Sequence, residues 1–320
     1  MVTTPGLQSF GIKKLKQLKF IENIDIELTN KCNFNCIYCY VKRDKTTHLK
    51  VSLLETILKY CEKNDVKNIT LTGGEPFLYK NFDYLIHLIE NTDINITFFT
   101  NGSFLKNVIK EYDFSQISIC LKRDCLSDGL QALVCGINQM PYNFFDLINS
   151  IKKEVKELTV HSALTAMNYK ELPQLYKILK NMGIPHYISR VVPSKETIKK
   201  IIPTKEMCKE VFSSIAKING KELTIPFAGD VGCIKMYCSI FIDRFGTIYP
   251  CSNLPIIVGK VNETKLKIEK QKLKIFRNID KEIKGKCKIC PYLSRCYGCR
   301  GIAFHITGDY LAGDPLCWRK

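Results

Sequence analysis

The chain has 320 residues, of which 45% are apolar and 25% are charged, so it is long enough for one large domain or for a domain with a smaller partner. It contains no apolar run of the roughly 18 residues that a membrane span needs. The first 20 residues lack the apolar core of a secretory signal, so we expect a cytoplasmic protein. The formal net charge of +17 favours an acidic partner, but the lysines are interleaved with apolar residues as on helix surfaces, so nucleic acid is a disfavoured partner.

Short apolar runs alternate with amphipathic segments in the first part of the chain. The predicted strands span residues 24–28, 68–71, 94–100, 116–121, 158–162 and 185–192. The predicted helices between them span residues 52–63, 82–90, 104–111, 142–155 and 172–182. Ser52 and Glu55 have the spacing of a capping box at the first helix. Six strand-then-helix units predict a parallel sheet that curves into a partial (β/α)6 TIM-like barrel, with ligands at the carboxyl ends of the strands.

The sequence pattern changes after Val192. We predict a helix over 204–218, a hairpin of strands 237–242 and 247–249 with Gly246 at the turn, and a helix over 266–279. From Gly229 onward the chain holds eight cysteines and few long apolar runs, so this part needs metal to fold. The predicted organisation is an N-terminal extension (1–20), a barrel (21–195), a connecting helix region (196–228) and a small cysteine-rich α+β domain (229–320).

Three cysteines follow the first predicted strand: Cys32, Cys36 and Cys39. A four-iron cluster held by three thiolates leaves one iron open, and that iron can bind the amine and carboxylate of a small molecule. A zinc site with a distant fourth ligand and a group of unrelated thiols are the alternatives at this point. After the second strand come Gly73, Gly74, Glu75 and Pro76. The glycines allow close backbone approach to a ligand, and the glutamate can accept a hydrogen bond from an ammonium group.

Through CNFNCIYC (32–39) and GGEP (73–76), the chain resembles the radical S-adenosylmethionine enzymes over residues 20–192. The resemblance implies that the three cysteines bind a 4Fe-4S cluster whose open iron chelates S-adenosyl-L-methionine. Reductive cleavage then gives a 5′-deoxyadenosyl radical that abstracts hydrogen from a substrate. The resemblance also implies an electron donor such as flavodoxin or ferredoxin. The implied cofactor contacts are Tyr38, Gly73, Gly74, Glu75, Pro76, Thr100, Asn101, Ser118, Asn168 and Arg190.

The eight C-terminal cysteines suit either two zinc sites or two fully ligated 4Fe-4S clusters. With CRGIAFHITGDYLAGDPLC (299–317), the array resembles the SPASM extension of the same family, although two residues separate Cys296 from Cys299 where three are usual. That resemblance implies two auxiliary clusters with interleaved ligands. The first cysteine set is Cys233, Cys238, Cys251 and Cys299, nearer the active site. The second cysteine set is Cys287, Cys290, Cys296 and Cys317.

Five cysteines lie outside these sets, and most of them are predicted to be small buried residues: Cys61, Cys120, Cys125, Cys135 and Cys208. Cys120, Cys125 and Cys135 lie on or after the fourth predicted strand. They are candidate hydrogen-atom donors to a substrate radical, as in epimerase-type members of the family. The sequence indicates no other catalytic residue.

The SPASM resemblance implies a peptide or protein substrate in most members, and an aminosugar or tetrapyrrole in others. Ser252 stands where sulfatase-maturing members have Asp, which disfavours that activity. About 20 residues precede the first strand, too few for a fused leader-binding domain, so a peptide would bind the barrel directly or arrive with a separate protein. The first hypothesis is oxidative modification of a ribosomally made peptide, giving a crosslink or thioether. The alternatives are dehydrogenation, epimerisation or decarboxylation of a small molecule, and a zinc-bound nucleic-acid-binding protein.

Overall fold

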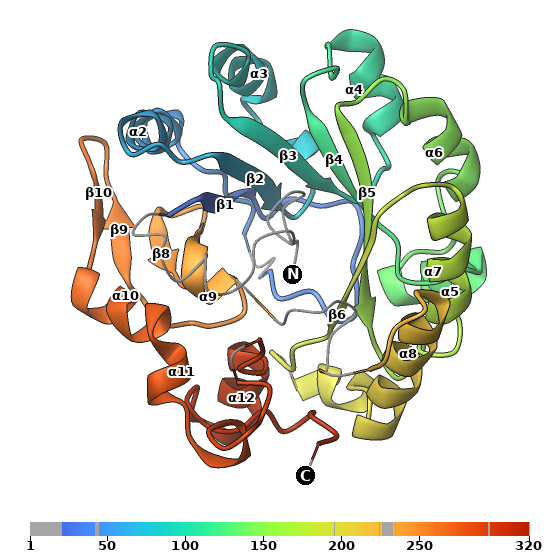
Figure 1. The fold of residues 1–320 in the computed structure, drawn as a ribbon. Helices are drawn as coiled ribbons and strands as arrows, with labels where there is room; N and C mark the ends of the chain where they lie inside the picture. The colour runs from blue at the N-terminus through green and yellow to red at the C-terminus, as the bar shows by residue number, and fades with distance from the viewer. Residues whose placement is uncertain are drawn as a thin grey trace.

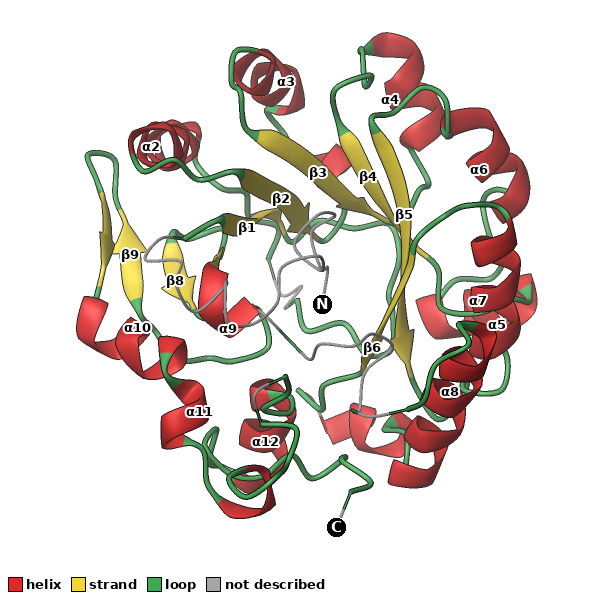
Figure 2. Ribbon diagram, viewed as in Figure 1, coloured by secondary structure: helices red, strands yellow, loops and turns green. Residues whose placement is uncertain are grey.

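The computed structural model describes residues 21–41, 45–194, 196–223, 225, 233, 235–293 and 295–319. A ten-stranded sheet curves around the centre of this part of the chain, in the order β10-β9-β8-β7-β1-β2-β3-β4-β5-β6 (Figure 1). Helices cover the outer face of the sheet, and α12 (Arg300–Thr307) lies at the open side between its two ends (Figure 2). The predicted extension over residues 1–20 lies outside the described residues.

The six predicted strands are all present and pair in parallel, in chain order. They are β1 (Asn23–Thr29), β2 (Asn68–Gly73), β3 (Asn95–Thr100), β4 (Ser118–Lys122), β5 (Glu157–Leu164) and β6 (His186–Arg190). Every residue of β1 is buried, as expected for a parallel strand that is covered on both faces. The predicted partial barrel is therefore confirmed.

The predicted barrel helices are also present, with small differences at their ends. They are α2 (Val51–Lys63), α3 (Phe82–Glu90), α4 (Leu105–Glu111), α6 (Phe144–Ile151) and α7 (Leu172–Asn181). The helix predicted for the connecting region is α8 (Lys205–Ile218). The predicted capping box is wrong, because Lys50 caps α2 and Ser52 lies inside its first turn. A short helix, α5 (Asp128–Cys135), was not predicted; it contains Gly129 and ends at Gly136, so its sequence resembles a loop.

The C-terminal region forms a strand meander followed by short helices. Its elements are α9 (Lys235–Cys238), β7 (Ser239–Ile242), β8 (Thr247–Tyr249), β9 (Gly259–Val261), β10 (Leu266–Ile268), α10 (Lys270–Arg277), α11 (Ile279–Glu282) and α12. β7 and β8 form the predicted antiparallel hairpin, with Gly246 at φ +79° in its turn. The predicted helix over 266–279 is wrong in its first residues, because Leu266 pairs with Val261 across the antiparallel β9–β10 ladder.

The C-terminal hairpin is part of the barrel sheet. β7 pairs in parallel with β1, in register from Asn23 opposite Ser239 to Ile26 opposite Ile242. One continuous core of buried apolar side chains also joins the barrel to this hairpin. The cysteine-rich region is therefore attached to the first barrel strand, next to the loop that bears Cys32. Within the described residues, no helix combines the length and the apolar character of a membrane span.

Candidate active site

A cavity lies at the carboxyl ends of the parallel strands, where a barrel of this kind holds its ligands. It encloses about 1210 Å³, a volume that includes its open mouth. Cys32, Cys36 and Cys39 all line it, so the three predicted cluster ligands border one space. The other predicted site residues that line the cavity are Tyr38, Gly73, Gly74, Thr100, Asn101 and Arg190.

Gly73 and Gly74 allow the end of β2 to lie against the loop that carries the three cysteines. The main-chain N–H of Gly74 donates to the carbonyl oxygen of Thr29 at 2.6 Å. A Cβ atom at Gly73 would lie 2.3 Å from that same oxygen, and a Cβ atom at Gly74 would lie 2.2 Å from the carbonyl oxygen of Lys31. Real Cβ atoms do not approach main-chain oxygens so closely, so a side chain at either position would push the cysteine loop away.

Glu75 is fully buried and supports the cavity from behind. Its carboxylate accepts hydrogen bonds from Thr100 Oγ1 at 2.7 Å and from the main-chain N–H of Asn101 at 2.9 Å. Burial raises the pKa of Glu75 to about 7, although these hydrogen bonds act to lower it. The side-chain Nδ2 of Asn101 in turn donates to Asn33 Oδ1 at 2.8 Å. Glu75 and Pro76 do not border the cavity, and the hydrogen bonds of Glu75 position the end of β3; contact of either residue with a cofactor stays a prediction.

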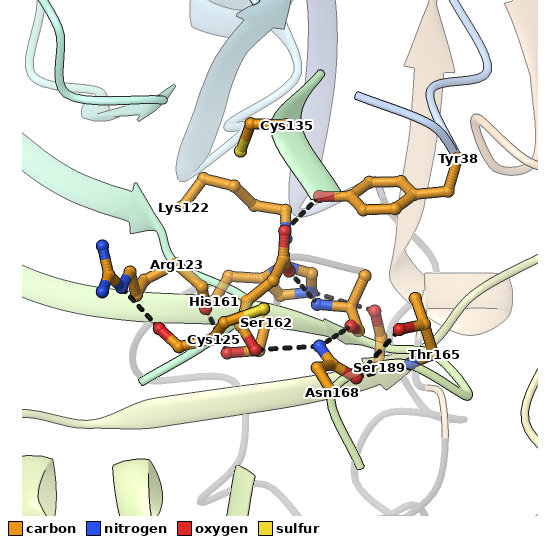
Figure 3. Close-up of polar contacts among 12 residues, drawn as sticks. Tyr38, Lys122, Arg123, Cys125, Cys135, His161, Ser162, Thr165, Asn168 and Ser189 are labelled. Carbon is orange, nitrogen blue, oxygen red and sulfur yellow. Dashed lines mark hydrogen bonds and ion pairs between the residues drawn. The ribbon is translucent and has the colours of Figure 1, made fainter. Parts of the chain in front are cut away.

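Tyr38 and Lys122 converge on one buried carboxylate, that of Asp124 (Figure 3). The Tyr38 hydroxyl donates to Asp124 Oδ2, and the Lys122 ammonium contacts Asp124 Oδ1 and lies 5.1 Å from the centre of the Tyr38 ring. The main-chain N–H of Ala163 also donates to Asp124 Oδ1, at 2.7 Å. Lys122 lines the cavity. Sequence reasoning missed Lys122 and Asp124, because a Lys-Arg-Asp run after a strand matches no motif.

Two predicted cofactor contacts do not border the cavity, and their role stays a prediction. Ser118 lies at the amino end of β4, roughly 13 Å of strand from Lys122 at the carboxyl end, and it does not border the cavity. Asn168 is fully buried, and its Nδ2 donates to the carbonyl oxygens of Asp124 and Ala163, each at 2.8 Å (Figure 3). Its side chain therefore joins two loops behind the cavity wall and has no donor left for a cofactor.

Arg190 borders the cavity at the carboxyl end of β6, and its guanidinium is paired with Asp314. The Nη2–Oδ2 distance is 2.6 Å and the Nη1–Oδ1 distance is 3.3 Å. Burial acts to lower the pKa of Arg190, but the Asp314 carboxylate more than offsets this and raises it above its ordinary value. The structure thus gives Arg190 a partner in the C-terminal region, and its contact with a cofactor stays a prediction.

Deeper in the barrel, polar side chains that were not predicted line the same cavity. Asp25 on β1 forms a buried ion pair with Lys235 on α9. His161 Nε2 lies 3.0 Å from Ser189 Oγ, and burial lowers the pKa of His161 well below its ordinary value. The imidazole is therefore neutral near pH 7. Sequence reasoning missed Asp25, His161 and Ser189 because they lie within strands that it expected to be apolar, and it missed Lys235 because it predicted no helix there.

The three candidate hydrogen-atom donors, Cys120, Cys125 and Cys135, are buried near the cavity but do not border it. Burial raises the pKa of Cys120 to about 11. Cys135 lies beside Cys36 and accepts a hydrogen bond from Gln131 Nε2 at 3.0 Å. None of the three thiols borders the cavity, and a donor role for any of them stays a prediction.

Members of the first cysteine set lie together in the C-terminal region. Burial and the neighbouring thiols of Cys251 and Cys299 raise the pKa of Cys233 to about 12. Ser252 and Asn253, which follow Cys251, line the cavity. In the second cysteine set, Cys287 lies near Cys296. The complete ligand sets, including Cys238, Cys290 and Cys317, stay predictions.

Main-chain hydrogen bonds to sulfur mark cysteines of all three predicted sites. The N–H two residues after the cysteine donates to Sγ at Cys32 (3.4 Å), Cys251 (3.4 Å) and Cys296 (3.3 Å). A thiolate accepts such bonds better than a thiol, and N–H donors to sulfur are one means by which proteins tune iron–sulfur clusters. The described residues include no group of His, Cys, Asp or Glu arranged to hold a single metal ion. Cysteine sulfurs that accept main-chain N–H groups are a donor set that suits iron–sulfur clusters.

Known proteins resemble the chain in both sequence and fold. The profile of the Radical SAM superfamily matches residues 26–122. The AdoMet-dependent heme synthase of Methanosarcina barkeri (strain Fusaro / DSM 804) is 24% identical, over 91% of this chain and 94% of that protein. SuiB of Streptococcus suis, solved with S-adenosylmethionine, has a TM-score of 0.70 at 19% identity, over 96% of this chain and 80% of that chain. The enzyme anSMEcpe, solved with AdoMet and the Kp18Cys peptide, has a TM-score of 0.66 at 17% identity, over 92% of this chain and 93% of that chain.

The profile match covers both the cysteine loop and the Gly73–Gly74 turn that packs on it. The solved structures share the barrel together with a C-terminal region. The chain therefore carries a region that matches the Radical SAM superfamily, within a partial barrel that is followed by a cysteine-rich C-terminal region.

Proposed function

We propose that the chain oxidatively modifies a peptide or protein, starting with abstraction of a hydrogen atom from the substrate. The observation that carries this proposal is the composition of one cavity wall. Cys32, Cys36 and Cys39 line the cavity from the barrel, and Ser252 and Asn253, next to Cys251, line it from the C-terminal hairpin. A substrate in this space lies between the proposed cofactor site and the first cysteine set.

The cavity residues supply the contacts that a bound cofactor needs. Cys32, Cys36 and Cys39 would hold a 4Fe-4S cluster, and the bound cluster and S-adenosyl-L-methionine supply a 5′-deoxyadenosyl radical. The main chain at Gly73 and Gly74 and the polar side chains of Thr100 and Asn101 line the space beside these cysteines. Tyr38 is held over the same space through its hydrogen bond to Asp124.

The two C-terminal cysteine sets would hold two auxiliary 4Fe-4S clusters, giving three clusters in all. A substrate that loses a hydrogen atom has lost one electron and one proton. Loss of a second electron to an acceptor beside the cavity, with release of a second proton, makes the net reaction a two-electron oxidation. The electron would then leave to a flavodoxin or ferredoxin, of the class that also supplies the reducing electron.

Two comparisons favour different substrates. SuiB has also been solved with its precursor peptide SuiA, and anSMEcpe with the Kp18Cys peptide, which supports a peptide substrate. The sequence similarity to AdoMet-dependent heme synthase over nearly the whole chain supports a tetrapyrrole as the second candidate. Lys122, Arg190 and Lys235 line the cavity, but each is already paired with a carboxylate of the chain, so they add no support for a carboxylate substrate. The clustering of eleven of the sixteen cysteines in proposed cluster sites suits a reducing compartment such as the cytoplasm.

Anaerobic purification and iron analysis test the proposal first. We expect a brown protein with about twelve irons per chain, three cubanes. With S-adenosylmethionine and a strong reductant it should form 5′-deoxyadenosine, and a precursor peptide encoded nearby should lose two mass units per modification. A colourless zinc protein would contradict the radical chemistry. Turnover of a tetrapyrrole carboxylate with no change in any peptide would favour the second candidate.

A further inference from the structure

Arg190 and Asp314 form an ion pair between the cavity and the C-terminal cysteines. Arg190 ends β6 and borders the cavity, and Asp314 lies in the segment between α12 and Cys317. Two hydrogen bonds join them, with a shortest nitrogen–oxygen distance of 2.6 Å. The side chains are 1% and 0% exposed, so water screens neither charge.

Asp314 bonds to cysteines of both sets. Its Oδ2 accepts the main-chain N–H of Cys299, of the first set, at 2.9 Å. Its own N–H donates to Cys287 Sγ, of the second set, at 3.3 Å. Its carbonyl oxygen accepts the N–H of Cys317, also of the second set, at 3.2 Å. Asp314 is thus hydrogen-bonded to the main-chain N–H or to the sulfur of three proposed cluster ligands.

Packing fixes the place of this pair. Gly298, between Cys296 and Cys299, has φ +69°, and a Cβ atom there would lie 2.5 Å from Asp314 Cβ. The main-chain N–H of Leu316 donates to Asp314 Oδ1 at 2.9 Å, so both carboxylate oxygens are held in position. Two opposite charges are therefore kept at fixed places beside both cysteine sets.

We propose that Arg190 and Asp314 are positioning residues that set the reduction potentials of the auxiliary clusters. The inference rests on the proposed function, because it needs clusters at these cysteines. A reduced cluster carries one more negative charge than the oxidised cluster. A nearby cation therefore stabilises the reduced form and a nearby anion destabilises it, and both effects are large where water is excluded.

The two residues should consequently shift the potentials in opposite directions. Arg190→Gln leaves the Asp314 carboxylate uncompensated, so we expect the reduced-to-oxidised ratio of the auxiliary clusters at a fixed potential to fall at least tenfold, about 59 mV for one electron. Asp314→Asn leaves the guanidinium uncompensated, so that ratio should rise by a similar factor. The double variant restores a neutral pair and Arg190→Lys keeps the charge, so both should remain near the unaltered protein.

The measurement is a redox titration of the anaerobically purified full chain with dithionite and mediators, followed by electron paramagnetic resonance. Arg123→Gln is the matched control, because Arg123 is a buried arginine whose guanidinium pairs with Asp128, away from the C-terminal cysteines. Its auxiliary signals should not move. Iron content, measured on every variant, separates loss of a cluster from a change of its potential.

Shifts in the same direction for Arg190→Gln and Asp314→Asn, or no shift with full iron loading, would overturn this inference and leave the proposed function standing. If Arg190→Gln loses iron, the other two variants still test the inference. Asp314→Asn must raise the reduced-to-oxidised ratio of the auxiliary clusters, and Arg190→Lys must leave that ratio unchanged. About four irons in the unaltered protein would overturn both the auxiliary clusters and the role of this pair.

Discussion

The Glu75 carboxylate accepts a hydrogen bond from Thr100 Oγ1 at 2.7 Å, although the two residues are 25 positions apart in the chain. The bond ties the turn after β2 to the end of β3. Gly74 packs on the main chain of Lys31, and Asn101 is hydrogen-bonded to Asn33. The Glu75–Thr100 bond therefore also holds the cysteine loop in place. The loop that bears the proposed cluster ligands is therefore held from two neighbouring strands.

Glu75 should make stability depend on pH. Burial raises its pKa from 4.5 to about 7. Below about pH 4.5 both the folded and the unfolded chain hold the proton, and from there to pH 7 only the unfolded chain releases it. The free energy of unfolding should therefore fall as pH rises through this window, by up to about 3 kcal/mol. Glu75→Gln should lack this component, and urea unfolding of both proteins at several pH values measures the difference. A constant difference between them would contradict the expectation.

Gly74→Ala should displace the cysteine loop. The new Cβ would meet the Lys31 carbonyl oxygen at 2.2 Å, a clash with main chain that costs about 1–3 kcal/mol to relieve. We expect lower thermal stability and loss of iron from one cluster. Gly129→Ala is the control, because a Cβ there meets nothing within 4 Å on α5. That variant should keep its iron and gain about 0.4–1 kcal/mol. Equal iron content in the two variants would count against the packing argument.

Cys36→Ala should remove one cluster and abolish formation of 5′-deoxyadenosine. Iron content should fall by about four atoms per chain, since a cubane held by two thiolates is labile. Cys61 offers the matched control, because it is fully buried in the core and away from the cavity. Cys61→Ala should lose some stability and retain both its iron and its activity. Continued 5′-deoxyadenosine formation by Cys36→Ala would refute the assignment of the cluster site.

Asp124→Ala should weaken binding of S-adenosylmethionine by roughly tenfold to a hundredfold. It removes the charged acceptor that holds the Tyr38 hydroxyl and the Lys122 ammonium, and such hydrogen bonds contribute about 1.5–3 kcal/mol. Isothermal titration of the cluster-loaded protein measures the dissociation constant. Asp128→Ala is the control, because that carboxylate is 52% exposed, also accepts from an arginine and does not border the cavity. A similar loss of affinity in both variants would show that Asp124 has no particular role.

Sequence reasoning located residues whose place depends on short motifs at strand ends. Cys32, Cys36, Cys39, Gly73 and Gly74 follow β1 or end β2, and parallel strands bring their carboxyl ends to one edge whatever the rest of the chain does. For Ser118 and Asn168 position near a strand was the only guide, and neither residue borders the cavity. Ser118 starts its strand instead of ending it, and the Asn168 amide bonds within its own loops.

The sequence by itself determined the alternation of strands and helices and the spacing of the cysteines, because hydrophobic period and motif are local properties. Only the tertiary structure decided that β7 joins β1, which brings Ser252 and Asn253 to the cavity that Cys32 lines. Only it decided that Arg190 meets Asp314, 124 positions further along the chain. Such contacts depend on how distant segments pack. The partner of a buried charge is set by the tertiary structure, and a local sequence pattern does not predict it.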